Sequence, residues 1–524
     1  MLLPGEPAPS RSGAGGAAMA GGLREHLVAY FTEHEKLVEA EALRLLLESH
    51  HPLLVSREVV ERAGAGSGFV TVDMVSAVLD DRQAISGARL RSGPAARPDR
   101  APTVIEGFVV VREGFAPPPP SATPLDAYST LFRSRFQALE RLLRGRPALP
   151  NLRPIRELRP ADGTASVIGM VREIRETQKR RHLIVTVDDP SGSLELLVPK
   201  ESPGARLPFV PDEVIGVKLR LGREEDRGPG RIPLAVGIER PDVPTQRTVG
   251  RAERPSKVLF LSDLHVGSRS FLAAEWGRLV DFLGERGPRP ELARQVEYVV
   301  VAGDLVDGIG IYPRQERDLA IADIVEQYAE LGRRLAELPA RLTIVVVPGN
   351  HDAVCTAEPQ PALPPTLVQE LPTNVRALPN PSTFALDGVV VQAYHGRGFD
   401  DLIPMIPGAS YGRPTEVMRR MLQMRHLGPI YGDRTPLAPL AHDGLVIDPL
   451  PDILVTGHLH TYGFERYRGV LMLNASAWQS ETEYQRMRNI VPVPAHAAIV
   501  DLATLELTTV DCGPDPATVE AAPT

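Results

Sequence analysis

The sequence contains little cysteine and few aromatic residues. Of its 524 residues only 2 are Cys and 2 are Trp, and Phe, Trp and Tyr together make up 5%. Two thiols, Cys355 and Cys512, exclude a disulfide framework and a four-cysteine zinc site, so any metal ion must be held by His, Asp and Asn. No run approaches the roughly 18 apolar residues of a membrane-spanning helix, and no secretion leader is evident. We therefore expect a cytoplasmic protein with no membrane partner.

The chain also lacks an excess of positive charge. It has 58 Lys and Arg against 66 Asp and Glu, a net charge of −8. A surface coated in positive charge is excluded, so any contact with nucleic acid must be local or supplied by a partner chain. What is abundant is proline and glycine, 51 and 45 residues, placed unevenly along a chain long enough for two to four domains. This distribution predicts linkers between folded units.

Changes in composition and periodicity divide the chain into seven segments. Leu27, Phe31, Leu43 and Leu46 have the spacing of amphipathic helices, whereas Pro117 to Pro120 are typical of an extended spacer, with an SH3-type ligand as the alternative. The expected segments are a disordered tail (1–21), a helical docking domain (22–81), a Pro/Arg-rich linker (82–124) and a helix with a connector (125–162). A β-barrel (163–245), an α/β domain (255–510) and a second tail (511–524) follow.

The barrel segment has five short alternating runs separated by turn residues. The turn Asp189-Pro190-Ser191-Gly192 predicts a tight hairpin between the second and third runs, and the whole set resembles an OB-fold. Lys179, Arg180 and Arg181 follow the first run. They either contact a phosphate backbone or form an ordinary solvated hairpin tip.

After Lys257, apolar strands alternate with helices, which predicts buried α/β layers. Each strand stops at a polar cluster, where an open α/β sheet places its ligands. The clusters are Asp263-Leu264-His265, Gly303-Asp304-Leu305-Val306-Asp307, Gly349-Asn350-His351-Asp352, Tyr394-His395-Gly396 and Gly457-His458-Leu459-His460. Carboxylate, imidazole and amide oxygen are ligands for divalent cations, and one carboxylate can bridge two ions. Taken together, the clusters indicate a metal site.

The order D-x-H, G-D-x-x-D, G-N-H-D, a lone His after a strand, and G-H-x-H resembles the calcineurin-like metallophosphoesterases over about residues 255–510. The resemblance implies a multidomain α/β protein whose phosphoesterase domain is a four-layer α/β/β/α sandwich, preceded by the OB-fold barrel and the small N-terminal helical domain. It also implies two divalent metal ions. One would be held by Asp263, His265, Asp304 and His460, and the other by Asp304, Asn350, His395 and His458.

The same resemblance makes His351 the proton donor to the leaving group, with Asp352 orienting its imidazole and favouring the protonated form. Asp307 would not bind a metal ion itself but would hold the ligand loop in position. The reaction implied is hydrolysis of a phosphodiester.

A narrower resemblance rests on Gly303–Arg314 (GDLVDGIGIYPR), Tyr411–Pro414 and Arg425–Gly432, together with the order of the domains. These features resemble the small subunits of archaeal family-D DNA polymerases. The resemblance implies a proofreading 3′–5′ exonuclease that uses Mn²⁺ or Mg²⁺, a large catalytic polymerase subunit as partner, and primer-template DNA or a single-stranded 3′ end as substrate. A free-standing phosphodiesterase or repair nuclease and a catalytically silent structural subunit are the alternatives. Intact ligands argue against the silent subunit.

A basic segment follows the fourth cluster. Its charged side chains, interleaved with Tyr and Met, could guide a single DNA strand: Arg413, Arg419, Arg420, Arg425 and His426. The alternative is an amphipathic helix over Thr415–Arg425 with Met418, Met421 and Leu422 packed inward.

Overall fold

In the computed structural model the chain divides into two units, residues 1–103 and 104–524. The described residues are parts of 27–78, all of 107–115, 123–221 except 180, 203 and 205, 232–513 except 483–484 and 487–489, and 518–521. The predicted disordered tail, 1–21, lies outside them, as does Arg180. Among the described helices, none is long and apolar enough to cross a membrane.

The first unit contains a small apolar core. Its elements include helix α2 (Ala40–Glu48) and the short parallel strands β1 (Leu37–Val38) and β2 (Phe69–Val70), and residues 72–78 are also helical. Leu27, Phe31 and Leu46 are fully buried, so the helical spacing of the apolar residues corresponds to a packed face.

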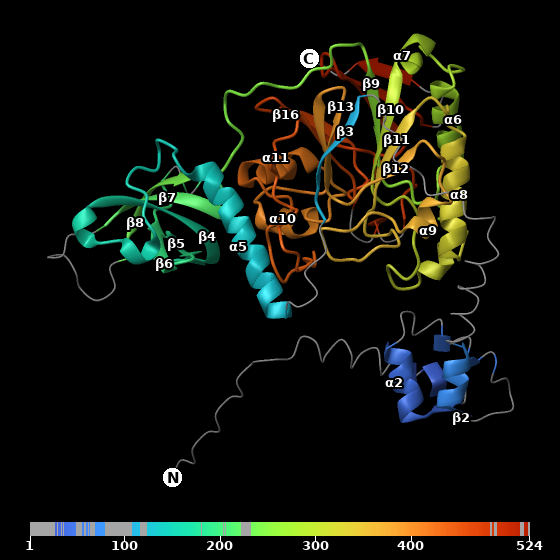
Figure 1. Ribbon diagram of the computed structural model, residues 1–524, viewed down its shortest axis with the longest axis horizontal. Coiled ribbons are helices and arrows are strands. Elements are labelled where there is room, and N and C mark those ends of the chain that lie inside the picture. The colour runs from blue at the N-terminus through green and yellow to red at the C-terminus, as the bar shows by residue number, and fades with distance from the viewer. Residues whose placement is uncertain are drawn as a thin grey trace. The chain divides into compact units, whose positions relative to one another are not determined.

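The second unit is built around two sheets that lie face to face (Figure 1). The seven-stranded sheet has the order β12-β11-β10-β9-β18-β19-β20, and the six-stranded sheet the order β16-β17-β15-β14-β13-β3. The strands of the first sheet are β9 (Lys257–Leu261), β10 (Val296–Ala302), β11 (Thr343–Val347), β12 (Val375–Ala377), β18 (His496–Asp501), β19 (Leu507–Asp511) and β20 (Thr518–Ala521). Those of the second are β3 (Phe108–Glu113), β13 (Ser382–Leu386), β14 (Val389–Ala393), β15 (Ile453–Thr456), β16 (Gly463–Tyr467) and β17 (Val470–Asn474).

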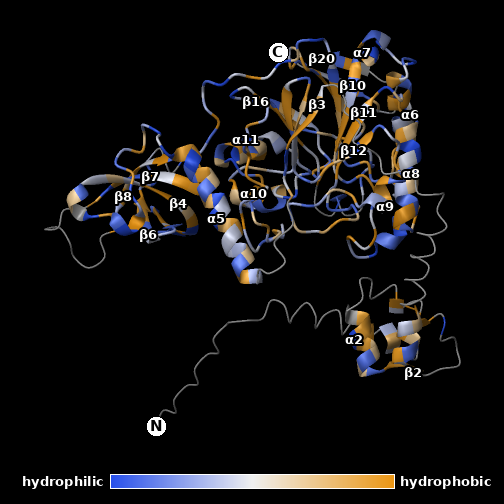
Figure 2. Cartoon of the chain, in the orientation of Figure 1, coloured by the Kyte–Doolittle hydropathy of each residue, from blue (hydrophilic) through white to orange (hydrophobic). Residues whose placement is uncertain are grey.

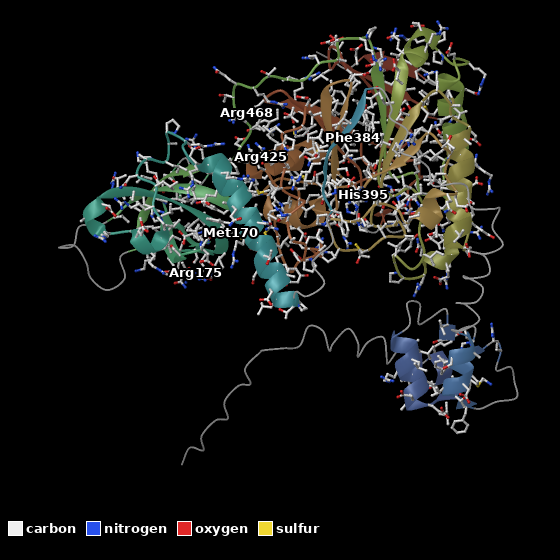
Figure 3. The ribbon with its side chains drawn as sticks, in the orientation of Figure 1. Met170, Arg175, Phe384, His395, Arg425 and Arg468 are labelled. Atoms are coloured by element: carbon white, nitrogen blue, oxygen red, sulfur yellow. The ribbon has the colours of Figure 1, made fainter. Side chains whose placement is uncertain are left out.

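Helices cover the outer face of each sheet. The first sheet carries α6 (Ala273–Leu283), α7 (Pro290–Arg294), α8 (Ile324–Ala336) and α9 (Pro365–Val368), and the second carries α10 (Phe399–Met405) and α11 (Pro414–Met424) (Figure 1). Alternate residues of β9 point to opposite faces: Leu259 packs with the helices, whereas Phe260 packs with Phe384 of the second sheet (Figure 3). Both faces of the central strands β9, β10, β11, β14, β15 and β17 are buried, and these strands consist mainly of apolar residues (Figure 2). The layers are therefore helices, sheet, sheet and helices.

Two strands lie in segments predicted to be irregular. Within the predicted linker 82–124, residues Phe108–Glu113 form the edge strand β3, which pairs with β13 across almost 270 residues of sequence. Within the predicted tail 511–524, residues 518–521 pair with β19 as β20. Both are short edge strands. The partner of β3 is supplied by a distant part of the chain, whereas β20 pairs with the strand directly before it in the sequence.

The barrel is closed and five-stranded, with the order β4-β5-β6-β8-β7. Its strands are β4 (Thr164–Glu176), β5 (Leu183–Asp189), β6 (Gly192–Val198), β7 (Val214–Arg220) and β8 (Leu234–Glu239). The predicted hairpin turn is present: Asp189 Oδ1 accepts hydrogen bonds from the backbone N–H groups of Ser191 and Gly192, at 2.7 and 2.9 Å. Of the basic run after the first strand, Arg181 pairs with Glu176 at 2.7 Å.

Buried ion pairs connect the barrel and helix α5 (Pro124–Leu143) to the α/β domain. The fully buried Arg135 of α5 contacts Asp443 at 2.6 Å. Glu213 of the barrel segment contacts Arg240 at 3.0 Å and Arg420 of α11 at 2.9 Å. Removing one member of such a pair leaves an uncompensated buried charge, so these contacts fix the barrel against the α/β domain.

The contacts of His426 beside Asp443 predict that the folded protein loses stability in acid. His426 donates from Nε2 to Asp443 at 3.0 Å and accepts at Nδ1 from the backbone N–H of Gly428 at 3.2 Å, so it is held neutral. Burial, with the charge of Arg135, lowers its pKa to about 4. The unfolded chain, with a pKa near 6.5, binds this proton first. The contribution of His426 to the free energy of unfolding is therefore greatest above pH 6.5, and it decreases by about 3 kcal/mol as the pH falls to 4.

Urea unfolding of the wild type and of His426→Gln between pH 7 and 4 measures this contribution. Glutamine takes up no proton in this range, so the variant should show a smaller loss of unfolding free energy on acidification. An equal loss in both proteins would contradict the assignment.

Candidate metal centre

The five polar clusters lie at one edge of the two sheets. Asp263, Asp304, His395 and His458 each stand two residues beyond the last residue of a strand, namely β9, β10, β14 and β15, and Asn350 stands three beyond β11. Strands β9, β10 and β11 are mutually parallel, as are β14 and β15. Carboxyl ends of parallel strands meet at one edge, which brings the five side chains together.

The ligand loops have an unusual backbone. Asp263, His265, Asp304, His458 and His460 all adopt left-handed conformations, with φ between 48° and 69°. Such conformations are uncommon outside glycine and concentrate at functional sites, where the surrounding structure holds them in place. The strained backbone therefore supports a functional role for these loops. The sequence motifs gave no indication of it.

Two glycines allow the loops to approach closely. A Cβ atom at position 303 would lie 2.3 Å from Nδ1 of His395, and one at position 349 would lie 2.2 Å from Oδ1 of Asp304. No side chain fits at either position without displacing a predicted ligand, so both residues must be glycine for the cluster to close.

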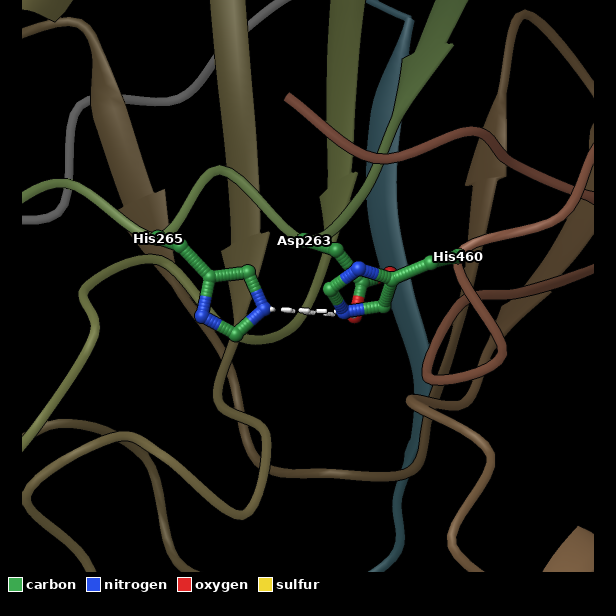
Figure 4. A group of neighbouring side chains, drawn as sticks. All are labelled: Asp263, His265 and His460. Carbon is green, nitrogen blue, oxygen red and sulfur yellow. Dashed lines mark hydrogen bonds and ion pairs between the residues drawn. The ribbon is translucent and has the colours of Figure 1, made fainter. Parts of the chain in front are cut away.

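The side chains form three overlapping groups, each with ligand atoms within 4.8 Å of one another. The groups are Asp263 with His265 and His460, His265 with Asp304 and His351, and Asp304 with His395 and His458. Figure 4 shows the first group, in which Nε2 of His265 and Nε2 of His460 are 3.0 Å apart beside the Asp263 carboxylate. Asn350 adjoins the third group, because its Oδ1 is 3.0 Å from Nε2 of His395. Asp304 belongs to two groups, which is the position required of a bridging carboxylate.

Contacts behind the rings orient the imidazoles. Nδ1 of His265 faces Asp307 Oδ1 at 3.1 Å, and Nδ1 of His395 faces the carbonyl of Ala302 at 3.0 Å. Nε2 of His458 faces Asp400 Oδ2 at 3.0 Å. In each ring the other nitrogen is left for the cluster, as metal-ligating histidines require.

The contacts that orient His351 differ from those predicted. Its Nδ1 donates to the backbone carbonyl of Asp307 at 2.7 Å, and its Nε2 lies 3.9 Å from Asp304 Oδ2. Asp352 does not orient the ring: its carboxylate accepts from the backbone N–H groups of Leu305 and Gly349 and from the Tyr328 hydroxyl. Nor is the protonated ring favoured, since burial lowers the pKa of His351. Asp307 therefore does the orienting, while Asp352 fixes the backbone of two ligand loops.

The cluster has the charge of a cation site. Asp263 and Asp304 are 0% and 2% exposed, and in the described part of the chain their ion-pair partners are all histidines. Burial opposes a charge on His395, but Asp304 and Asp263 outweigh it and raise the pKa of this imidazole to about 10. Two buried carboxylates without Lys or Arg partners need positive charge from another source. Divalent cations fit this donor set.

Three of the five basic side chains predicted to guide a DNA strand are buried. Arg420, Arg425 and His426 are 3%, 3% and 1% exposed, which excludes them from contact with DNA (Figure 3 shows Arg425). The amphipathic alternative is the one observed: α11 buries Met418, Met421 and Leu422. Arg413 and Arg419 remain accessible and pair with Glu416 and Glu465. The charges of the three buried residues serve interior ion pairs and hydrogen bonds, which linear spacing does not reveal.

Three residues of the site were missed by sequence reasoning. Asp400 contacts His458, Gln485 contacts Nδ1 of His460 at 2.7 Å, and Gln479 donates to Asp307 Oδ1 at 3.0 Å. None lies in a motif, and the sequence carried no signal that could have found them. Their importance arises only from proximity after folding.

The fold and this donor set define the class of the α/β domain, a calcineurin-like phosphoesterase. Residues 258–464 match the family model for the B subunits of DNA polymerases alpha and epsilon. The DNA polymerase II small subunit of Archaeoglobus fulgidus is 43% identical over 70% of this chain and 73% of its own length. That of Methanothermobacter thermautotrophicus is 36% identical over 92% of this chain and 98% of its own. The chain belongs to the DNA polymerase II small-subunit family.

Among solved structures, vacuolar protein sorting 29 of Cryptosporidium parvum aligns with 51% of this chain and 97% of its own length. The identity is 16% and the TM-score 0.27.

Proposed function

We propose that this chain is the proofreading subunit of a two-subunit archaeal replicative DNA polymerase and acts as a 3′–5′ exonuclease. The observation that carries the proposal is the complete donor set, with every ligand implied by the resemblance gathered at one edge of the sheets. A subunit with a silent site has no reason to keep two buried carboxylates and five strained backbone positions.

In this proposal Asp263, His265, Asp304 and His460 hold one divalent ion, and Asp304, Asn350, His395 and His458 hold the second. Mn²⁺ or Mg²⁺ bound there would neutralise phosphodiester oxygens and make water a stronger nucleophile. The protein's own contribution is to fix these ligands. It does so by holding the nitrogen of each imidazole that faces away from the cluster, as in His265, His395 and His458.

His351 delivers the proton in this proposal. The Asp307 carbonyl accepts a hydrogen bond from Nδ1–H, and Nε2 faces Asp304 and the cluster, so the proton to be delivered is the one that Nε2 carries when the ring is doubly protonated. Burial lowers the pKa of this ring, so the imidazolium gives up its Nε2 proton readily. The oxygen of water bonds to phosphorus and releases a proton to the solvent, the bond from phosphorus to the 3′-oxygen breaks, and the leaving 3′-oxygen takes the proton from Nε2, which the solvent then replaces. The products are a nucleoside 5′-monophosphate and a DNA strand shorter by one nucleotide.

The remaining domains suit such a subunit. We interpret the five-stranded barrel, whose strand order is β4-β5-β6-β8-β7, as an OB-fold. The relatives are named small subunits, which supports a large catalytic subunit as partner and primer-template DNA or a free 3′ end as substrate. The polymerisation chemistry belongs to that large subunit.

A 5′-labelled primer with a mismatched 3′ end, annealed to a template and incubated with the purified chain and Mn²⁺, tests the proposal. We expect stepwise shortening from the 3′ end that EDTA abolishes, with His351→Ala as the control for contaminating nuclease. Absence of shortening, both by the chain alone and after addition of the large subunit, would make the chain a structural subunit with a silent site.

A further inference from the structure

The loop that follows Asp307 carries three large side chains with apolar surface, one of which, Tyr312, lies beside His351. Ile309 and Ile311 are each 37% exposed, although both belong to the loop that directly follows the ligand loop of Asp304. Tyr312, in the same loop, is half-buried, and its ring centroid lies 6.5 Å from that of His351 at an angle of 53°. We call these three residues the lip.

The lip is preformed rather than loose. Buried Gln315 accepts from the backbone N–H of Ile311 at 2.9 Å and donates to the carbonyl of Asp307 at 2.8 Å. Buried Gln327 accepts from the N–H of Gly308 at 2.9 Å. The Tyr312 hydroxyl donates to Asp318 at 3.1 Å. Two buried glutamine side chains thus fix the backbone of the lip, so its apolar side chains are already in place before any ligand binds.

The loop is also tied to the proton donor. A Cβ atom at position 308 would lie 2.2 Å from the carbonyl oxygen of His351, so the loop passes directly over this residue. The Asp307 carbonyl that holds the His351 ring lies at the start of the same loop. Whatever the lip binds is therefore held close to the leaving group of the reaction.

We propose that the lip receives an unpaired nucleobase, that of the nucleotide whose 3′-oxygen is the leaving group. This inference rests on the proposed nuclease function. His351 protonates a 3′-oxygen that stays on the shortened strand, so the adjacent base belongs to the penultimate nucleotide. A flat base can stack on Tyr312 and contact the two isoleucines, but a base within a duplex is already stacked and paired. The lip therefore selects substrates whose last two nucleotides are unpaired.

The test compares two substrates and two proteins. One substrate is an oligonucleotide with two unpaired 3′-terminal nucleotides, and the other is the same strand with an abasic penultimate residue. Tyr312→Ala should lower kcat/KM on the base-containing substrate about tenfold, mainly through KM, because stacking of one base on an aromatic ring has about this strength. On the abasic substrate wild type and Tyr312→Ala should be equal. Tyr312→Phe keeps the ring but loses the hydrogen bond to Asp318, so it should retain a preference for the base-containing substrate that Tyr312→Ala lacks.

The possible failures are distinguishable. If the wild type degrades neither oligonucleotide, the proposed nuclease function fails. If the wild type is active and Tyr312→Ala is equally active on the base-containing strand, the lip does not bind a base. If the variant loses the same factor on both substrates, Tyr312 supports His351 structurally and the inference is overturned. Ile309→Ser, at an exposed position, provides the same comparison should Tyr312→Ala fail to fold.

Discussion

Asp304→Asn is expected to lose bound divalent metal and nuclease activity together, with turnover falling by about 10³-fold or more. Asp304 lies in two of the three ligand groups, so its charge serves both ion positions. Asparagine keeps the acceptor for the backbone N–H of His351, at 2.9 Å in the wild type, and tolerates the left-handed φ of 48°. The change therefore removes one negative charge and little else.

Metal content by elemental analysis, measured beside turnover, tests this expectation. Asp433→Asn is the matched control, because this aspartate is exposed and the same charge is removed there. Normal metal occupancy in Asp304→Asn would contradict the bridging assignment.

His351→Ala is expected to keep its metal and lose most of its catalysis, by about 10²- to 10⁴-fold, the range of general acid–base contributions. The ring is only 15% exposed, yet neither ion position requires it in the proposed ligand sets. Its partner at Nδ1 is a backbone carbonyl, which persists in the variant. Loss of activity without loss of metal would separate a proton donor from a ligand.

A substrate with a good leaving group sharpens the test. A diester whose leaving group needs no proton, such as a nitrophenyl ester, should be cleaved by His351→Ala at nearly the wild-type rate. His442→Ala, at an exposed histidine, serves as the control for the substitution itself. If metal content fell with activity in His351→Ala, His351 would be a ligand, as its membership of one side-chain group would allow.

The two predictions rest on different levels of evidence. The gathering of these Asp, Asn and His side chains could be predicted from the sequence because each polar cluster follows an apolar strand, and strand ends are local features. The way the rings are held could not be predicted. Asp307 rather than Asp352 orients His351, and Asp400, 58 residues from His458, orients that ring.

The basic segment shows the same limit. Its helical periodicity correctly placed Met418, Met421 and Leu422 inside, because period and burial are linked along one helix. Periodicity does not say whether an arginine faces water or a distant carboxylate. Arg420 contacts Glu213, 207 residues away, and His426 contacts Asp443 beneath Arg135 of α5.

The sequence by itself determined the alternating strands and helices of the α/β domain, the strand-end positions of the polar clusters and the hairpin of the barrel. The physical reason is that hydrophobic period, turn residues and strand ends are properties of short contiguous segments. The tertiary structure alone decided the edge strand β3, the buried arginines, the contacts that orient the imidazoles and the position of the lip beside His351. Each of these depends on a partner from another part of the chain, and only folding determines which partner that is.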